Sequence, residues 1–313
     1  MHQLNYIVKR VLQIIPIVLL VTVLIFLLMR LIPGDPVEIM LGEKYTEEKA
    51  FVIRETLGLN EPLYVQYFIF LRNLLTLNLG NSIVYIIPVS RLLTQRIGVT
   101  LLLTLVTAVF VLLISFPLGY IAAIKRGSAS DQIVRIVALI SLALPQFWIG
   151  LLFLLLFGLK LRWLPVAGWG STWPEHLLAM VLPGLTQSLA TTSLMVRNLR
   201  SGIIDVLNSD YVDFAKSKGL NPKVVRTKYI VRNALISTVT LFSMRLTYML
   251  SGSVVIETVF ALPGIGSLLV SSILSRDYAV VQATVFLFAL LVMLSNLLTD
   301  ILYSVLDPRV RLD

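Results

Sequence analysis

The sequence predicts an all-α integral membrane protein with six transmembrane helices and one large segment outside the lipid. Of its 313 residues, 57% are hydrophobic and only 14% are charged, whereas a soluble globular domain carries about 25% charged residues. Six apolar stretches are long enough to cross a hydrocarbon core of about 30 Å, which takes roughly 20 helical residues. None of them alternates apolar and polar residues as a membrane β-barrel does. A soluble enzyme, a nucleic-acid-binding protein and a disordered chain are therefore excluded.

The first apolar stretch follows Lys9 and Arg10, as a secretory signal would. It is longer than the 7–15 apolar residues of such a signal, and no small-residue cleavage site follows, so we expect it to be retained as a span. We expect Pro16, Pro117 and Pro145 to kink the spans in which they lie. The predicted spans are Val11–Met29, Ile97–Ile124, Ile136–Leu159, Leu177–Val196, about Ala234–Phe260 and about Tyr278–Leu306.

Lysine and arginine are unevenly distributed between the two sides of the predicted bundle. With a cytoplasmic N-terminus, the inner segments hold 15 of these residues and the short outer loops hold only Lys160, Arg162 and Arg276. Basic residues accumulate on the cytoplasmic side of membrane proteins. We therefore expect both termini in the cytoplasm, and we attribute the net charge of +9 to the anionic inner leaflet rather than to nucleic acid.

The segment between the first two spans is far longer than a connection requires. Thr46 is expected to begin a helix with Glu47 in its first turn and Gly58 as its stop, and a second amphipathic helix is expected over Tyr64–Leu77. We interpret the segment as a folded extracytoplasmic cap; a tolerated surface insertion is the alternative. The predicted parts of the chain are the N-terminal tail and first span (1–30), the cap (31–96), the transmembrane core (97–306, with its cytoplasmic loop 197–233) and a cytoplasmic C-terminal tail (307–313).

The cytoplasmic loop carries the clearest local signals for helix ends. Asp210 is a favourable helix N-cap, and Gly219 with Leu220 is typical of a helix C-cap about two turns later. Asn221 followed by Pro222 is typical of a new N-cap with proline at the first helical position. The loop is therefore expected to fold as helix, sharp turn and helix.

One face of the first of these helices carries Tyr211, Phe214 and Ala215, flanked by Lys216 and Lys218. A helix of eight residues does not persist alone in water, so something must pack against it. We expect this face to enter a groove of a cytoplasmic partner. The alternative is a helix lying on anionic lipid.

This loop resembles the EAA-x3-G loop of the membrane permease subunits of ATP-binding-cassette importers, in the dipeptide/oligopeptide/nickel branch. The matching residues run from Asp213 to Gly219, with Asp213 in place of Glu and Phe214 in place of the first Ala. The large outer segment resembles that of the first permease of a pair. Further segments resemble the family in the same order, namely Pro33-Gly34-Asp35-Pro36, Leu57 to Tyr67, Trp163-Leu164-Pro165, Glu257 to Gly266, Arg276-Asp277-Tyr278 and Asp307-Pro308-Arg309.

The resemblance implies a non-enzymatic subunit in the cytoplasmic membrane of a prokaryote. Its implied partners are a second, homologous permease, two cytoplasmic ATPase subunits and an extracytoplasmic solute-binding protein. ATP and Mg²⁺ would belong to the ATPases, which agrees with the lack of a G-x4-G-K-[ST] phosphate loop in this chain. With no cysteine and two histidines, no metal site is expected. The implied ATPase-coupling residues are Asp210, Tyr211, Asp213, Phe214, Ala215, Lys218 and Gly219.

Two ionisable residues of the fifth span, Arg245 and Glu257, are candidates for the translocation path, because charges are costly in lipid. Arg245 could instead pair with the partner permease or reach for the interface, and Glu257 could be a hydrogen-bonded structural residue. The expected cargo is a di- or oligopeptide; nickel chelates, glutathione-like molecules and oligosaccharides remain alternatives.

Two other classes of membrane protein, an ATP-independent secondary transporter and a membrane-embedded hydrolase, would show different sequence patterns. The first predicts a repeat between the two halves or an acidic site at mid-membrane, and the second predicts a Ser-His, paired-Asp or metal group within the spans. Neither pattern is found in the sequence.

Overall fold

The computed structural model describes residues 2–31, 36–41, 45–56 and 58–306. The predicted C-terminal tail 307–313, and parts of the motifs at Pro33 and Leu57, lie outside these ranges. Within them every long element is a helix, and an isolated bridge joins Asn81 to Pro88. The chain forms two compact units, Met1–Val99 with Pro263–Leu294 and Thr100–Leu262 with Ser295–Asp313.

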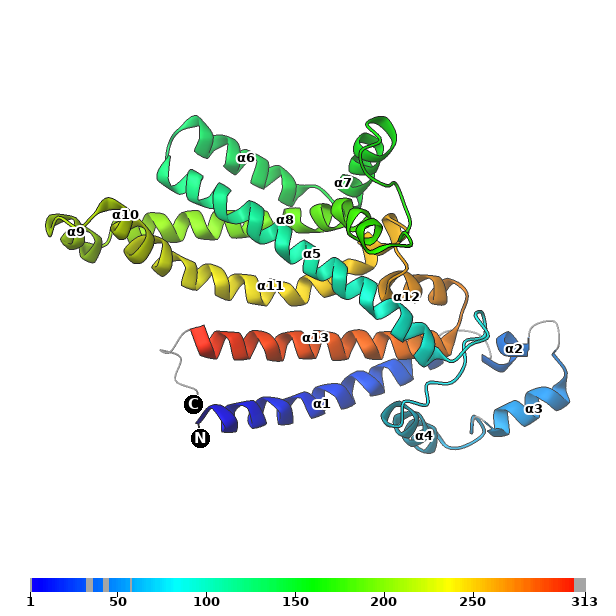
Figure 1. Cartoon of the computed structure of the whole chain (residues 1–313). Coiled ribbons are helices and arrows are strands. Elements are labelled where there is room, and N and C mark those ends of the chain that lie inside the picture. Colours follow the sequence, from blue (N-terminus) through cyan, green and yellow to red (C-terminus); the bar gives the residue numbers. More distant parts are fainter. Residues whose placement is uncertain (1, 32–35, 42–44, 57, 307–313) are drawn as a thin grey trace. The chain divides into compact units, whose positions relative to one another are not determined.

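The first unit contains α1 (His2–Leu31), the helices of the predicted cap, the start of α5 (Val89–Ile124), α12 (Ile265–Leu274) and most of α13 (Tyr278–Leu306). Its core joins α5, α12 and α13 through the fully buried side chains of Val89, Ile265 and Val280. Figure 1 shows the cap helices in blue to cyan, following α1 along the chain.

The cap contains α2 (Pro36–Leu41), α3 (Glu47–Thr56) and α4 (Leu63–Leu75). The predicted start of α3 after Thr46 is confirmed, and Gly58 follows the helix with a φ of +65°. The predicted end of the second helix at Leu77 is wrong, because α4 ends at Leu75 and Leu77 adopts a φ of +56°.

Helix α4 is joined to α1 by an aromatic contact and a hydrogen bond. The ring of Tyr67 packs edge-on against Phe26 at a centroid distance of 5.4 Å, and its hydroxyl lies 2.9 Å from the Thr22 hydroxyl. The cap therefore packs on the first helix.

The second unit contains the remainder of α5, α6 (Ala129–Ala143), α7 (Gln146–Phe153), η2 (Leu154–Lys160), α8 (Trp173–Leu207), α9 (Asp210–Ser217), α10 (Pro222–Val224), η3 (Val225–Val231) and α11 (Arg232–Val259). Helix α8 packs against α11 and α6. It also packs closely on α5, because a Cβ atom at Gly184 would lie 2.7 Å from Val106 Cγ1. Small residues permit such close approach between membrane helices.

Four helices are long and apolar enough to cross a membrane: α5, α8, the continuous helix Pro222–Val259 and Tyr278–Ile301 of α13. The third predicted span is instead two helices, Ala129–Ala143 and Gln146–Lys160, bent by 108° where Pro145 lies between them. The described apolar part of α1 is Leu12–Leu28. The all-α membrane class is confirmed, and the count of six spans stays a prediction.

Candidate functional site

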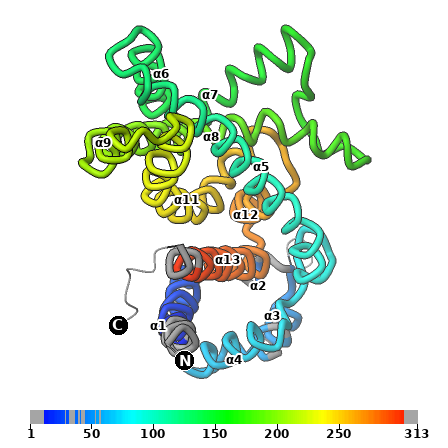
Figure 2. The backbone as a smooth tube through the Cα atoms, turned by 60° about the vertical axis from the view of Figure 1, so that its left-hand side comes forward, coloured from blue at the N-terminus to red at the C-terminus, as the bar shows by residue number. Residues whose placement is uncertain are grey.

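The predicted helix-turn-helix is present at one end of the second unit, as α9 followed by the helix that begins at Pro222 (Figure 1; Figure 2 shows α9 from another side). The prediction that Asp210 is the N-cap is wrong, because Asp210 is the first residue of α9. Ser209 is the N-cap, because its backbone is extended and its carbonyl accepts from the amide of Val212. The carboxylate of Asp210 lies in the first turn, where the helix dipole favours negative charge.

The turn between the helices is formed as predicted. Gly219 has a φ of +70°, and its amide donates to Lys216 while the amide of Leu220 donates to Ala215. These two bonds form the Schellman arrangement, which favours glycine at the left-handed position. Asn221 caps the next helix by accepting from the amide of Lys223 at 2.9 Å.

The side chains of α9 face two directions. Val212 and Ala215 are buried, in a cluster that includes Ile203 of α8 and Ile230 of η3. Phe214 is 61% exposed and Tyr211 is 43% exposed. Ala215 therefore does not share the outward face with the two aromatic residues, as the helical spacing suggested, but belongs to the internal packing that holds α9 in place.

The exposed face of α9 is ordered by short-range contacts. The hydroxyl of Tyr211 accepts from Asn233 Nδ2 at 3.1 Å, and Lys218 Nζ lies 4.5 Å from the centre of the Phe214 ring. Asp213 pairs with Lys216 at 2.8 Å in an exposed ion pair. The aromatic side chains are thus presented to solvent together with charged neighbours.

A buried ion pair, which the sequence did not reveal, joins α6 to α8 in the same unit. Arg200 donates from Nε and Nη2 to the two carboxylate oxygens of Asp131, at 2.7 and 2.8 Å. The Asp131 side chain is 1% exposed. Both residues lie outside the uncharged stretches predicted to cross the lipid. The hydrogen bond from Arg200 lowers the pKa of Asp131 to about 2, against the opposing effect of burial.

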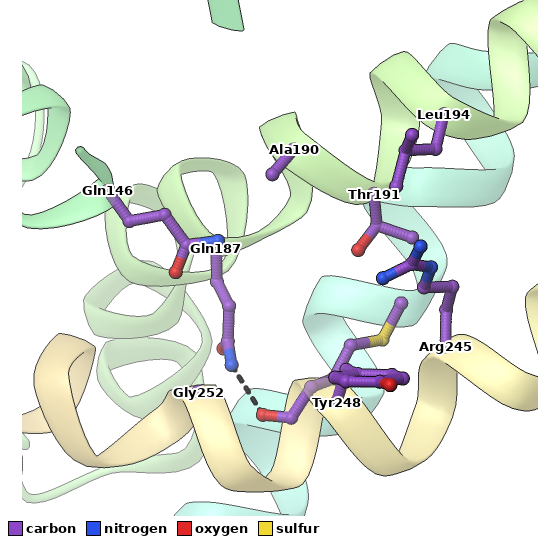
Figure 3. Close-up of a pocket in the computed structure, with 9 residues that line it drawn as sticks. Gln146, Gln187, Ala190, Thr191, Leu194, Arg245, Tyr248 and Gly252 are labelled. Atoms are coloured by element: carbon purple, nitrogen blue, oxygen red, sulfur yellow. Dashed lines mark hydrogen bonds between the residues drawn. The ribbon is translucent and has the colours of Figure 1, made fainter. Parts of the chain in front are cut away.

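A polar cavity with a volume of about 210 Å³ lies between α7, α8 and α11. Gln146, Gln187, Thr191, Arg245 and Tyr248 supply its polar lining. Figure 3 shows the guanidinium of Arg245 directed toward Thr191, with both glutamines on the other side of the cavity. Arg245, a predicted path residue, therefore lines this cavity.

Glu257, the other predicted path residue, does not line this cavity. Its side chain is fully buried, and Thr100 donates to its Oε1 at 2.6 Å. The structure thus separates Arg245 and Glu257, although both lie on α11. No group of three or more His, Asp or Glu side chains that could hold a metal ion is found in the described part of the chain.

Residues 115–312 match the model of the family described as binding-protein-dependent transport system inner membrane component. The chain belongs to this family. Residues 3–84 match the model of the N-terminal part of the same membrane component. Together the two matches cover residues 3–84 and 115–312.

Two full-length relatives of the family are similar to this chain. The glutathione transport system permease protein GsiC of Salmonella choleraesuis (strain SC-B67) is 38% identical over 308 residues, covering 98% of this chain and 99% of the relative. The oligopeptide transport system permease protein AppB of Bacillus subtilis (strain 168) is 38% identical over 312 residues with the same coverage.

Solved structures of transporters share the fold. The methionine ABC transporter MetNI in an inward-facing conformation matches with a TM-score of 0.57 at 17% identity, covering 70% of this chain and 97% of the matched chain. An amino acid ABC transporter solved with histidines matches with a TM-score of 0.55 at 13% identity, covering 69% and 94%. The fold is therefore that of an ABC transporter permease.

Proposed function

We propose that this chain forms half of the membrane pathway of an ATP-driven peptide importer. A second, homologous permease would supply the other half, two cytoplasmic ATPase subunits would hydrolyse ATP with Mg²⁺, and an extracytoplasmic solute-binding protein would deliver the cargo. The chain itself would carry no enzymatic activity. The relatives named for glutathione and oligopeptide transport support a peptide-type cargo.

The observation that carries the proposal is the two-sided packing of α9. Its inner face is fixed by the buried side chains of Val212 and Ala215, while Tyr211 and Phe214 stand out to solvent. An exposed pair of aromatic residues on a braced helix suits insertion into a groove, because aromatic anchors dominate protein interfaces. We assign Asp213, Lys218 and Gly219 to shaping and flanking this surface.

The remaining parts of the chain have proposed places in the same assembly. Both termini and the loop 197–233 would face the cytoplasm of a prokaryotic cell, where the basic residues accumulate. The cap 31–96 would face outward and contribute to the surface that receives the solute-binding protein. The core 97–306 would form the pathway.

A pair of substitutions on α9 tests the coupling surface. Phe214→Ala is expected to lower the amount of ATPase that co-purifies with the tagged chain about tenfold or more, with little change in thermal stability. Val212→Ala is the matched control, because it empties buried volume and is expected to destabilise the chain by about 1–3 kcal/mol. Full ATPase retention by Phe214→Ala would exclude α9 as the coupling surface.

An ATP-independent transporter is separated from this proposal by reconstitution of the assembly in vesicles. Uptake of the cargo, whether peptide or another molecule, is expected to require ATP and the binding protein. Nickel chelates and oligosaccharides are the alternative cargoes, and a thermal-shift screen of the binding protein distinguishes them from peptides.

A further inference from the structure

Several polar side chains line the cavity of the second unit, although it lies among predicted lipid-crossing segments. Gln146, Gln187 and Arg245 line it from three different helices, and each lies near the middle of a predicted span. Polar side chains at such depth are costly unless they face water, a ligand or one another. Their convergence on one cavity indicates a binding site.

Arg245 supplies a positive charge that the described part of the chain does not neutralise. No described carboxylate forms an ion pair with it, and its guanidinium carbon lies 5.0 Å from the centre of the Tyr248 ring. A guanidinium presents five donors in a planar fork that matches a carboxylate. The cavity is therefore suited to an anion.

The two glutamines have different roles in the cavity. Gln187 is fixed, because its Nε2 donates to the Met249 carbonyl at 2.5 Å and its Oε1 accepts from Thr107 at 3.0 Å. The side chain of Gln146 forms no hydrogen bond to another described residue, and Gln146 is the first residue of α7, directly after the break at Pro145. The partial positive charge of a helix N-terminus adds to the field of Arg245.

We propose that this cavity binds the terminal carboxylate of a peptide during its passage. The guanidinium of Arg245 would pair with the carboxylate, and the amide of Gln146 would donate to it. A volume of about 210 Å³ is smaller than the roughly 300–1,000 Å³ of whole-ligand pockets, so the site receives one end of the cargo. The inference rests on the proposed peptide importer and names the group that its pathway recognises.

The test compares transport of tri-alanine with transport of its C-terminal amide. The assembly of permeases, ATPases and binding protein is reconstituted in vesicles with saturating binding protein, for wild type, Arg245→Gln and Arg245→Lys. Arg245→Gln is expected to lower uptake of the free acid about tenfold or more, the effect of losing a charged hydrogen bond, and to leave uptake of the amide within about twofold. Arg245→Lys, which keeps the charge, is expected to retain most of the preference for the acid.

The ratio of acid to amide uptake isolates the permease, because the binding protein is the same in every sample. Arg126→Gln removes an exposed positive charge outside the cavity and is the control. An equal loss of both peptides in Arg245→Gln would mean that Arg245 pairs with the partner permease, and it would overturn the proposal. Unchanged uptake of both would overturn it too.

A second measurement removes the binding protein altogether. Radiolabelled tri-alanine is equilibrated with the purified complex of permeases and ATPases, and saturable binding is expected in wild type but about tenfold weaker in Arg245→Gln. Absence of saturable binding in a wild-type complex that transports peptide would refute the site alone. Absence of any ATP-dependent uptake by wild type would instead refute the proposed importer.

Discussion

The carboxylate of Asp277 accepts a hydrogen bond from the hydroxyl of Ser82 at 2.5 Å, across 195 positions of sequence. The same oxygen, Oδ2, accepts from the amides of Ile83 and Val84, and Oδ1 accepts from the amide of Val280 in the first turn of α13. Asp277 and Ser82 are both buried. One carboxylate thus fixes the segment that precedes α5 to the start of α13.

Replacing Asp277 by Ala is expected to destabilise the first unit by about 3 kcal/mol or more, because several buried donors lose their acceptor at about 1–3 kcal/mol each. Ser82→Ala removes one of these donors and is expected to cost about 1 kcal/mol. Thermal unfolding of the detergent-solubilised protein measures both. Similar losses of stability for the two variants would contradict the role of Asp277 as the shared acceptor of these hydrogen bonds.

The Asp131–Arg200 pair predicts a defined pH dependence. The pKa of Asp131 is lowered to about 2 in the folded chain, so its stabilisation is present above the unfolded pKa of about 3.9 and is lost as the pH falls through about 2. Wild type is expected to exceed Asp131→Asn in stability by about 2 kcal/mol, equally at pH 5 and pH 8. A difference that changes between those two values would contradict the assignment.

Two glycines on long helices predict opposite effects of alanine. Gly184→Ala would place a Cβ atom 2.7 Å from Val106 Cγ1 and is expected to cost about 1–3 kcal/mol through overpacking. Gly98→Ala, on α5, meets nothing within 4 Å and is expected to be neutral or slightly stabilising. Denaturation of the two variants in the same detergent checks the contrast.

The turn after α9 depends on backbone conformation rather than on space. Gly219 has a φ of +70° and would have nothing within 4 Å of an added Cβ atom, so a β-branched residue suffers from the left-handed conformation alone. Gly219→Val is expected to raise the ATP hydrolysed per peptide transported, whereas Gly219→Asn should stay near wild type because asparagine tolerates this region. Equal coupling in all three proteins would contradict a coupling role for the turn.

The predicted orientation is testable because the sequence contains no cysteine. Asn78→Cys, in the outer segment, is expected to react with a membrane-impermeant maleimide in intact cells. Arg226→Cys, in the cytoplasmic loop, should react only after the membrane is permeabilised. The reverse labelling pattern would show that the predicted orientation is wrong.

The helix-turn-helix of the loop could be predicted because its signals are local. Gly219 tolerates the left-handed conformation, Asn221 caps the next helix with its side chain, and Pro222 fixes its own φ; the structure places the turn there. The observed N-cap of α9, Ser209, precedes the predicted one, Asp210, by one residue. Both residue types are favourable N-caps, and the observed cap is the residue whose carbonyl accepts the first helical hydrogen bonds.

Features that depend on distant packing could not be predicted. Helical spacing places Phe214 and Ala215 on one face of the helix. Only the buried cluster around Ile203 shows that Ala215 points inward. The partner of Asp131 lies 69 residues away, and the cavity of Arg245 depends on the bend at Pro145. The sequence indicated that Pro145 would bend the chain, but not that the bend would be 108°.

The unbroken helix from Pro222 to Val259 gives the loop a direct mechanical link to the cavity. Its 38 residues span about 57 Å at 1.5 Å per residue, and Arg245 lies on the same helix that Asn221 caps. A tilt of this helix at the loop would therefore move Arg245 directly, without a chain of side-chain contacts between the loop and the cavity. The π-helical turns of η3, at Val225–Val231, lie within this helix, between the loop and Arg245.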